Sequence, residues 1–185
     1  MLSLAERQIN EVDFFTISIG PGSFTGLRVG LSTVKGLCFS TGKPLVAVSS
    51  LEAFAHLFVN TAKTVCPLFD ARKKEVYGAL FRSEAGEMKR LTSDMVCPVE
   101  HILSLTEGDT LFAGSGAQRY REKIIDTLSE RAHFASAPLM HPLSSAVAML
   151  GLRKAKRGEF SEAATITPLY IRPSEAELKR QEKGV

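Results

Sequence analysis

Hydrophobic and polar positions follow two different periods along the first forty residues. Residues 14–19 read Phe-Phe-Thr-Ile-Ser-Ile, in which polar and apolar side chains alternate as in a half-buried strand. Apolar residues then recur at helical spacing over residues 27–38. Between these segments lies the glycine-rich run 20–28, Gly-Pro-Gly-Ser-Phe-Thr-Gly-Leu-Arg. The pattern predicts a strand, a tight turn and a helix, with Ser23 or Thr25 as the N-cap.

The rest of the chain predicts an α/β protein. An apolar strand over 44–48 precedes Ser49-x-x-Glu52, the pattern of a capping box that opens a helix, and a polar linker follows at 60–63. Strands are predicted over 64–69 and 75–81 around a turn at 70–74, and then a strand over 87–92, a helix after Pro98, a strand over 110–113, a helix over 115–129, a strand near 133–135 and a helix from 144 to about 158. Strands first and alternating helices and strands later are typical of the α/β class.

The glycine-rich turn has two interpretations. Glycines let the backbone approach an anion, and free N–H groups at a helix start point toward it, so Gly20, Gly22 and Ser23 could contact a phosphate. The same turn could be a tight connector. Its sequence matches neither a Walker loop nor G-x-G-x-x-G, and Ser23 does not lie in G-x-S-x-G. Both interpretations stay open.

The predicted helix has an unusually bare face. Gly26 and Gly30 lie four residues apart, and a glycine inside a helix costs roughly 0.5–1 kcal/mol relative to alanine. Such a face admits another backbone, either from the protein's own sheet or from a partner helix. We predict a partner surface, which would self-pair in a homodimer when no other partner is present, formed by Phe24, Thr25, Gly26, Arg28, Gly30, Leu31 and Lys35.

Composition points to an ordinary cytoplasmic protein. The 185 residues include three cysteines without C-x-x-C spacing, Cys38, Cys66 and Cys97, which predicts reduced packing residues. No apolar run approaches the ~20 residues of a membrane span, and no leader pattern opens the sequence. The net charge of +3 is weak evidence for nucleic acid, although cations cluster at 72–74, at 153–157 and in the C-terminal tail.

Few residues form a catalytic or metal-binding pattern. The four histidines are never four residues apart, so H-x-x-x-H is missing, and we predict neither a metal site nor a catalytic residue. Asp70 and Arg72, at the end of a predicted strand, could position a magnesium-bound phosphate or nucleotide. The favoured alternative is an Asx-type turn in which Asp70 caps the backbone and Arg72, Lys73 and Lys74 face water.

Several motifs, taken in order, resemble the bacterial TsaB family, also called YeaZ. They are the segment 19–30, Lys35-Gly36-Leu37, the segment 44–53, Asp70-Ala71-Arg72 with Glu75-Val76-Tyr77, Ala113-Gly114-Ser115-Gly116, and the segment 168–172. The resemblance spans nearly the whole chain. It implies an actin-like two-domain fold with the ribonuclease H-like motif, in which residues 1–62 form part of a first domain and residues 63–185 form the second domain with a C-terminal tail.

The resemblance also implies a function. Family members act as a non-catalytic subunit beside TsaD, with the ATPase TsaE, in placing threonylcarbamoyl on the tRNA adenosine next to the anticodon. This chain alone would then bind no cofactor, the complex would use ATP, and tRNA would be contacted only through the complex. The alternatives are a nucleotide-binding ATPase of the sugar-kinase and hsp70-like superfamily and, less favoured, a glycoprotease-like peptidase.

One departure from the family concerns the N-terminus. Residues 1–5 resemble the tail of the family's first helix, and residues 10–13 resemble the turn into the next strand. The family begins earlier, with three antiparallel strands, so roughly 40 residues would be absent. We therefore expect the strand over 14–19 to have an uncovered edge.

Overall fold

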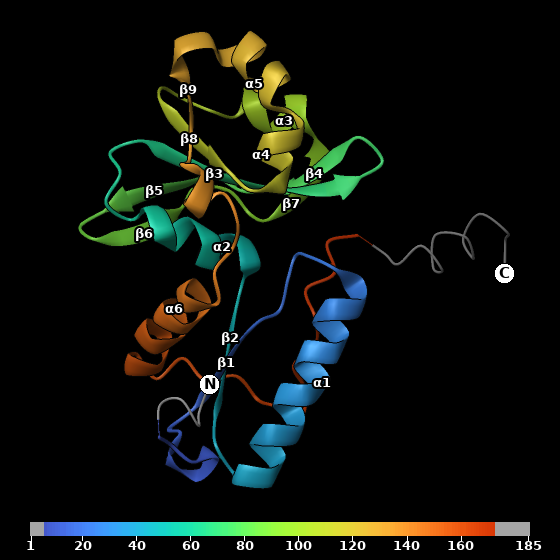
Figure 1. Ribbon diagram of the computed structural model, residues 1–185, viewed down its shortest axis with the longest axis vertical. Coiled ribbons are helices and arrows are strands. Elements are labelled where there is room, and N and C mark those ends of the chain that lie inside the picture. Colours follow the sequence, from blue (N-terminus) through green and yellow to red (C-terminus); the bar gives the residue numbers. More distant parts are fainter. Residues whose placement is uncertain (1–5, 173–185) are drawn as a thin grey trace, which may run out of the picture.

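The computed structural model describes residues 6–172, which form two sheets and their covering helices (Figure 1). This mixed architecture confirms the predicted α/β class. The predicted helix tail at residues 1–5 and the tail cations beyond residue 172 lie outside the described residues. No helix among the described residues is long and apolar enough to cross a membrane.

The first sheet is a parallel pair joined by a helix. Strands β1 (Phe15–Ser18) and β2 (Leu45–Val48) pair in register, after the 3-10 turn η2 (Ile9–Glu11), and α1 (Phe24–Thr41) connects them. Of the two predicted N-caps, Ser23 is the one observed, since its hydroxyl accepts from the N–H of Gly26 at 3.3 Å. The helix ends at Gly42, whose φ of +69° is the left-handed conformation that favours glycine.

The C-terminal part of the described chain returns to this first sheet. Helix α6 (Ser144–Lys156) packs on β1 and β2, and Figure 1 shows α6 and α1 on opposite sides of the two strands. Leu150 of α6 belongs to a buried cluster with Val46 and Val48. Beyond α6, the N–H of Leu169 donates to the carbonyl of Ile19 at 2.8 Å. The predicted domain boundary at residues 62 and 63 stays a prediction.

The second sheet is built around one long central strand. Its strands are β3 (Thr64–Arg72), β4 (Glu75–Gly78), β5 (Phe81–Glu84), β6 (Glu87–Arg90), β7 (Met95–Pro98), β8 (Thr110–Ala113) and β9 (Ala132–Phe134). Their order is β6-β5-β3-β4-β7, with β8 parallel to β3 and β9 parallel to β8. Both β4 and β5 pair antiparallel with β3, at opposite ends of that strand.

Two sequence predictions need correction here, and one strand was missed. The strand predicted over 75–81 splits into β4 and β5, because the N–H of Leu80 leaves the ladder and donates to the hydroxyl of Thr92 at 2.9 Å. Strand β7 was not predicted. The helix predicted over 115–129 breaks into α4 (Ser115–Arg119) and α5 (Arg121–Leu128), because Tyr120 has φ −106° and ψ 21°, outside the helical region.

Helices cover both faces of the second sheet. Helix α3 (Val99–Ser104), α4 and α5 bury one face, and α2 (Ser50–Ala55) with the turn η3 (His56–Phe58) and the 3-10 turn η5 (Ala137–Leu139) buries the other. Fully buried phenylalanines, each worth about 1.5–3 kcal/mol of burial, are Phe54, Phe81 and Phe112. Gly114 permits the close approach of α4, since a Cβ there would lie 2.2 Å from the carbonyl oxygen of Leu68 and its φ is +103°. The three cysteines are free and buried, as predicted.

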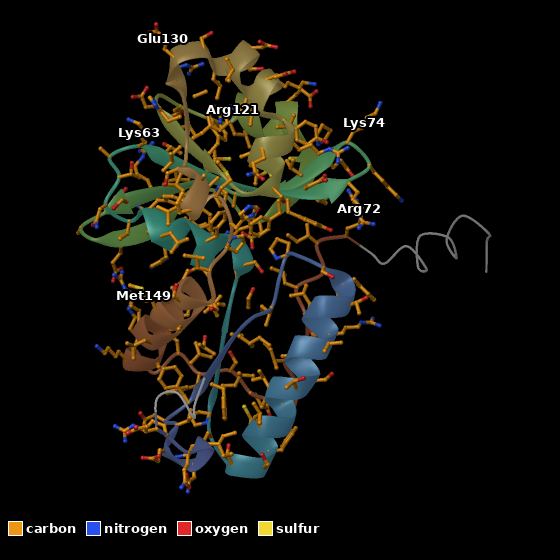
Figure 2. All side chains as sticks on the ribbon, viewed as in Figure 1. Lys63, Arg72, Lys74, Arg121, Glu130 and Met149 are labelled. Carbon is orange, nitrogen blue, oxygen red and sulfur yellow. The ribbon has the colours of Figure 1, made fainter. Side chains whose placement is uncertain are left out.

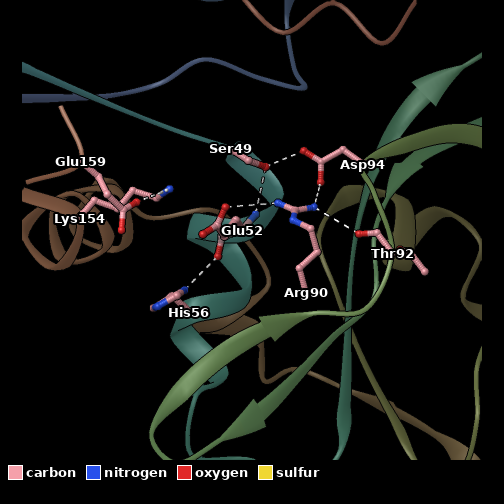
Figure 3. A network of polar contacts seen from close by, with 8 residues as sticks. All are labelled: Ser49, Glu52, His56, Arg90, Thr92, Asp94, Lys154 and Glu159. Carbon is pink, nitrogen blue, oxygen red and sulfur yellow. Dashed lines mark hydrogen bonds and ion pairs between the residues drawn. The ribbon is translucent and has the colours of Figure 1, made fainter. Parts of the chain in front are cut away.

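An ionic network fastens α2 to the loop between β6 and β7 (Figure 3). Ser49 caps α2, as predicted, and accepts from the N–H of Glu52 at 3.3 Å. The Glu52 carboxylate does not complete the capping box: it pairs with Arg90 at 3.3 Å. Arg90 also pairs with Asp94 and lies 4.7 Å from the centre of the Phe81 ring. The hydroxyl of Ser49 donates to Asp94 at 2.7 Å, so the network is closed.

Candidate functional site

The outer face of α1 is exposed and carries small and apolar residues. Val29 and Phe39 are 62% and 68% exposed, which is unusual for side chains of this kind. Between them in the sequence, Gly36 has no atom within 4 Å of the place where a Cβ would be. Gly26 is also exposed, although a Cβ there would lie 3.4 Å from its own cap residue Ser23. The outer face of α1, as defined by these four residues, therefore presents exposed backbone between two apolar side chains.

The seven residues of the predicted partner surface lie in three different environments. Thr25 and Gly26 are exposed, as a partner surface requires. Phe24 stacks on Tyr170 with ring centroids 4.9 Å apart, and Arg28 donates to the Tyr170 hydroxyl at 2.7 Å. These two side chains are therefore held by the returning C-terminal segment.

The remaining three predicted residues point elsewhere. Lys35 donates to the carbonyl of Ala164 at 3.0 Å, also in the returning segment. A Cβ at Gly30 would lie 3.7 Å from Ile17 of β1, so Gly30 faces the protein's own sheet. Leu31 is 5% exposed and belongs to the core, which removes its side chain from any exposed surface. The contacts of this surface with a partner stay a prediction.

Sequence reasoning missed Val29 and Phe39. The helical pattern over residues 27–38 was assigned to the buried face, and these two apolar residues fall outside it. Their position on the polar side of an amphipathic helix was the signal that could have identified them. An apolar residue on that side is often incidental, so the signal becomes strong only when the exposure is known.

A cleft of about 1080 Å³ lies next to the start of α1. Its walls come from the glycine-rich turn, the starts of α2 and α6, the β3–β4 hairpin and the segment 169–172. The cleft brings together four residues predicted from sequence to contact a phosphate, Gly22, Ser23, Asp70 and Arg72. Whether a phosphate or nucleotide binds there stays a prediction.

Gly20, the fifth residue of that prediction, is not among the residues that line the cleft. Its φ is +122°, and a Cβ would lie 2.9 Å from the carbonyl oxygen of Leu169. Its own carbonyl accepts from the N–H of Ser50 at 2.7 Å. The tight-connector interpretation therefore accounts for Gly20, whereas Gly22 is open to the cleft with no atom near its Cβ position.

Asp70 forms the Asx-type turn that the sequence favoured. One carboxylate oxygen accepts from the N–H of Arg72 at 2.9 Å, and the other pairs with Arg119 at 3.0 Å. The N–H of Asp70 donates to the hydroxyl of Ser115 at 3.1 Å. The carboxylate charge is thus balanced within the protein. Arg72 itself is exposed at the border of the cleft.

Few titratable groups near the cleft are perturbed. Burial raises the pKa of Tyr77, which lines the cleft. The His56 ring nitrogen Nδ1 lies 3.4 Å from the carbonyl of Glu52, and Nε2 of His133 lies 3.5 Å from the carboxylate of Asp109. Among residues 6–172, no group of three or more His, Cys, Asp or Glu side chains is arranged to hold a metal ion.

Comparison with known proteins identifies the class of protein to which this fold belongs. A family model described as TsaD, tRNA N6-adenosine threonylcarbamoyltransferase, matches residues 1–180. A crystal structure from Pseudomonas aeruginosa, described as an uncharacterized protein with similarity to peptidase YEAZ, superimposes with a TM-score of 0.80 at 29% identity. It covers 92% of this chain and 79% of that one. The fold is therefore that of the actin-like threonylcarbamoyltransferase class.

Relatives within this class specify the family. The tRNA threonylcarbamoyladenosine biosynthesis protein TsaB of Bacillus subtilis is 32% identical over 182 residues, which covers 97% of this chain and 78% of that protein. The tRNA N6-adenosine threonylcarbamoyltransferase of Bartonella bacilliformis is 41% identical over only 66 residues, or 36% of this chain and 18% of the enzyme. The chain belongs to the TsaB family, as its motifs indicated.

Proposed function

We propose that this chain is the partner subunit of a TsaD-like threonylcarbamoyltransferase, which modifies the tRNA adenosine next to the anticodon. The observation that carries the proposal is the extent of the similarity. The family model matches residues 1–180 and does not separate the two kinds of protein, but the TsaB relative aligns along 97% of this chain, whereas the transferase relative aligns along 36% of it. A subunit of the modification system fits this distribution better than the transferase itself.

The subunit acts by docking rather than by catalysis. The outer face of α1 offers two exposed apolar side chains and the open backbone at Gly36, which suit a second helix. In the absence of the transferase, the same face pairs with a second copy around a two-fold axis. A TsaE-like ATPase joins the complex, ATP is used there, and tRNA reaches this chain through the complex.

The catalytic alternatives have less support. In the Asx turn, Asp70 is already paired with Arg119 and with the N–H of Arg72, so its carboxylate is engaged inside the protein. The word peptidase in the description of the P. aeruginosa structure applies to that protein. Here His56 and His133 contact Glu52 and Asp109 rather than a serine or cysteine nucleophile.

Reconstitution with the purified TsaD-like and TsaE-like proteins tests the proposal. The wild-type chain should form a stable complex with the transferase and be required for threonylcarbamoyl formation on a tRNA transcript, measured by mass spectrometry of the nucleosides. A Val29→Glu/Phe39→Glu variant should keep its melting temperature and lose the complex, because two exposed positions become charged inside the contact. Light scattering should also show this variant as a monomer where the wild type dimerises.

The matched control places the same two charges on another helix. Met149 and Leu152 of α6 are exposed apolar residues as well, so Met149→Glu/Leu152→Glu should leave the complex intact. Equal loss of the complex in both double variants would contradict docking through α1. Modification that proceeds at the full rate without the chain would contradict the proposed function itself.

A further inference from the structure

The hairpin that joins β3 to β4 has an unusual backbone. Arg72 pairs with Glu75, and the two residues Lys73 and Lys74 make the whole connection. The φ angles of Arg72, Lys73 and Lys74 are +59°, +49° and +64°, all in the left-handed region. Two-residue connections of this kind need positive φ at both positions, which is why Asn-Gly is the preferred sequence. This hairpin has two lysines there instead.

The turn therefore carries positively charged residues at positions where the backbone conformation favours glycine or asparagine. Residues with a Cβ are disfavoured in the left-handed region, and glycine or asparagine is disfavoured least. Nothing in the packing compensates, because all three side chains are exposed. A run of disfavoured conformations that the surrounding contacts do not explain is a reason to look for a function.

The three cations are also uncompensated. Within residues 6–172, no hydrogen bond or ion pair is formed by the side chains of Arg72, Lys73 or Lys74. The two carboxylates that flank the turn in the sequence are paired with other arginines, Asp70 with Arg119 and Glu75 with Arg172. Figure 2 shows Arg72 and Lys74 at the outer end of the hairpin, away from the body of the sheet. The hairpin tip, defined as residues 72–74, is thus a local concentration of free positive charge.

The hairpin tip shares a cleft with the start of α1. Arg72 lines this cleft together with Ser23 and Thr25. The Arg172 guanidinium donates to the carbonyl of Ala71 at 2.9 Å and so fixes the base of the hairpin to the segment that also holds α1. The hairpin tip is therefore held in a fixed position relative to the start of α1.

We infer that the hairpin tip binds the phosphate backbone of the tRNA that the complex modifies. This inference rests on the proposed function. Lysine ammonium groups act as point charges that adapt to phosphates, and the tip has no aromatic side chain to stack on a base, so the contact is independent of nucleotide sequence. A charged turn at the end of two strands of the second sheet holds the RNA in position and leaves the reaction to the transferase.

The test replaces the two lysines with the residues that the turn prefers. In the assembled complex, Lys73→Asn/Lys74→Gly should weaken binding of a fluorescently labelled tRNA transcript about tenfold or more near 0.1 M salt, and reduce the slope of log K against log salt by about 1–2. The same variant should raise the melting temperature by roughly 2–4 °C, because the backbone is relieved. Higher stability with weaker RNA binding is a pair of results that a purely structural turn would not produce.

Two further variants complete the test. Lys73→Arg/Lys74→Arg keeps the charge and should bind tRNA like the wild type. Arg82→Gln/Lys89→Gln removes two cations from the β5–β6 pair, at the other edge of the sheet, and should leave affinity and slope unchanged. Equal weakening by this control pair would overturn the inference in favour of a general charge effect.

Other outcomes would overturn the inference in distinguishable ways. Wild-type tRNA affinity in an assembled Lys73→Asn/Lys74→Gly complex would refute the RNA contact and leave the proposed function standing. Loss of assembly, with normal tRNA affinity in the assembled fraction, would show that the tip binds an acidic protein surface. A wild-type chain that never assembles with the transferase would refute the proposed function, and this inference with it.

Discussion

His56 is a partly buried histidine. It lies at the end of α2, next to Glu52 and close enough to Arg153 and Glu87 to feel their charges. Burial lowers the pKa of His56 below its ordinary value of 6.5, and the carbonyl of Glu52 opposes this change only partly. The folded protein therefore holds the ring neutral at a pH where the unfolded chain already binds a proton.

The consequence is a loss of stability in mild acid. Between the two pKa values the unfolded state binds more protons, so stability falls as the pH drops through about 6.5 and levels off below the folded pKa. A His56→Asn variant should therefore lose less of its melting temperature than the wild type between about pH 7 and 5. The exposed His101 serves as the control, and His101→Asn should keep the wild-type pH dependence. Superimposable wild-type and His56→Asn curves would refute this account.

The roles of residues that depend on near neighbours in the sequence could be predicted. Contacts between residues far apart in the sequence could not. Ser23 was identified as a cap because capping depends on residues three positions away. The engagement of Phe24 and Arg28 by Tyr170 depends on a residue more than 140 positions later in the sequence. No spacing rule relates such positions, so the predicted partner surface included side chains that the protein itself holds.

At the scale of elements, Arg90 connects α2 with the edge of the second sheet. Arg90→Ala should destabilise the protein by about 2–3 kcal/mol, because Asp94, whose side chain is 7% exposed, would lose its ion-pair partner. The substitution also removes the guanidinium that covers the Phe81 ring. Urea unfolding at neutral pH measures the change in the free energy of unfolding.

An arginine on the neighbouring strand provides the comparison. Arg82 is exposed, so Arg82→Ala should change the free energy of unfolding by no more than about 0.5 kcal/mol. In the double variant Arg90→Ala/Asp94→Ala, the total cost should be smaller than the sum of the single costs, since the buried carboxylate is removed with its partner. An Arg90→Ala protein as stable as Arg82→Ala would mean that the network contributes little.

The type of an element could be predicted where the hydrophobic period continues over several residues. The predicted boundaries were wrong where a side chain takes a backbone hydrogen bond. Thr92 takes the N–H of Leu80 and divides a strand that reads as continuous in the sequence. Strand β7 is only four residues long and has no clear alternation, so it gave no signal. The capping box was half correct because Arg90, distant in the sequence, competes for the carboxylate of Glu52.

At the scale of the whole molecule, substitutions at two glycines of α1 distinguish packing within the protein from docking of a partner. Gly36→Leu should keep the melting temperature or raise it slightly, because the position is open and leucine is the better helix former. The same variant should weaken transferase binding roughly 5- to 150-fold, because overpacking a close contact costs about 1–3 kcal/mol. Calorimetric titration with the TsaD-like protein measures the affinity.

Gly30→Leu should show the opposite behaviour. Its side chain would press on Ile17 of β1, so the melting temperature should fall while the affinity of each folded molecule for the transferase changes little. Intact binding by Gly36→Leu would count against the outer face of α1 as the docking surface. The pair therefore resolves the two interpretations of the bare helix that the sequence alone left open.

The α/β class could be predicted from local periodicity, and the TsaB family from the resemblance of several motifs in order. The packing of the C-terminal helix on the first sheet could not be predicted. Helix α6 packs on β1 and β2, although about one hundred residues separate these elements in the sequence. Amphipathic periodicity shows that α6 has a buried side without showing which sheet that side covers.

This packing determines the order of folding during synthesis. The second sheet, from β3 to β9, consists of consecutive residues and can form as soon as they leave the ribosome. The first sheet must wait for α6, which at 5–20 residues per second emerges roughly 5–20 s after β2. Until then the apolar side chains of β1 and β2 lack their cover on the side that α6 occupies, so this pair of strands is synthesised before the second sheet and completed after it.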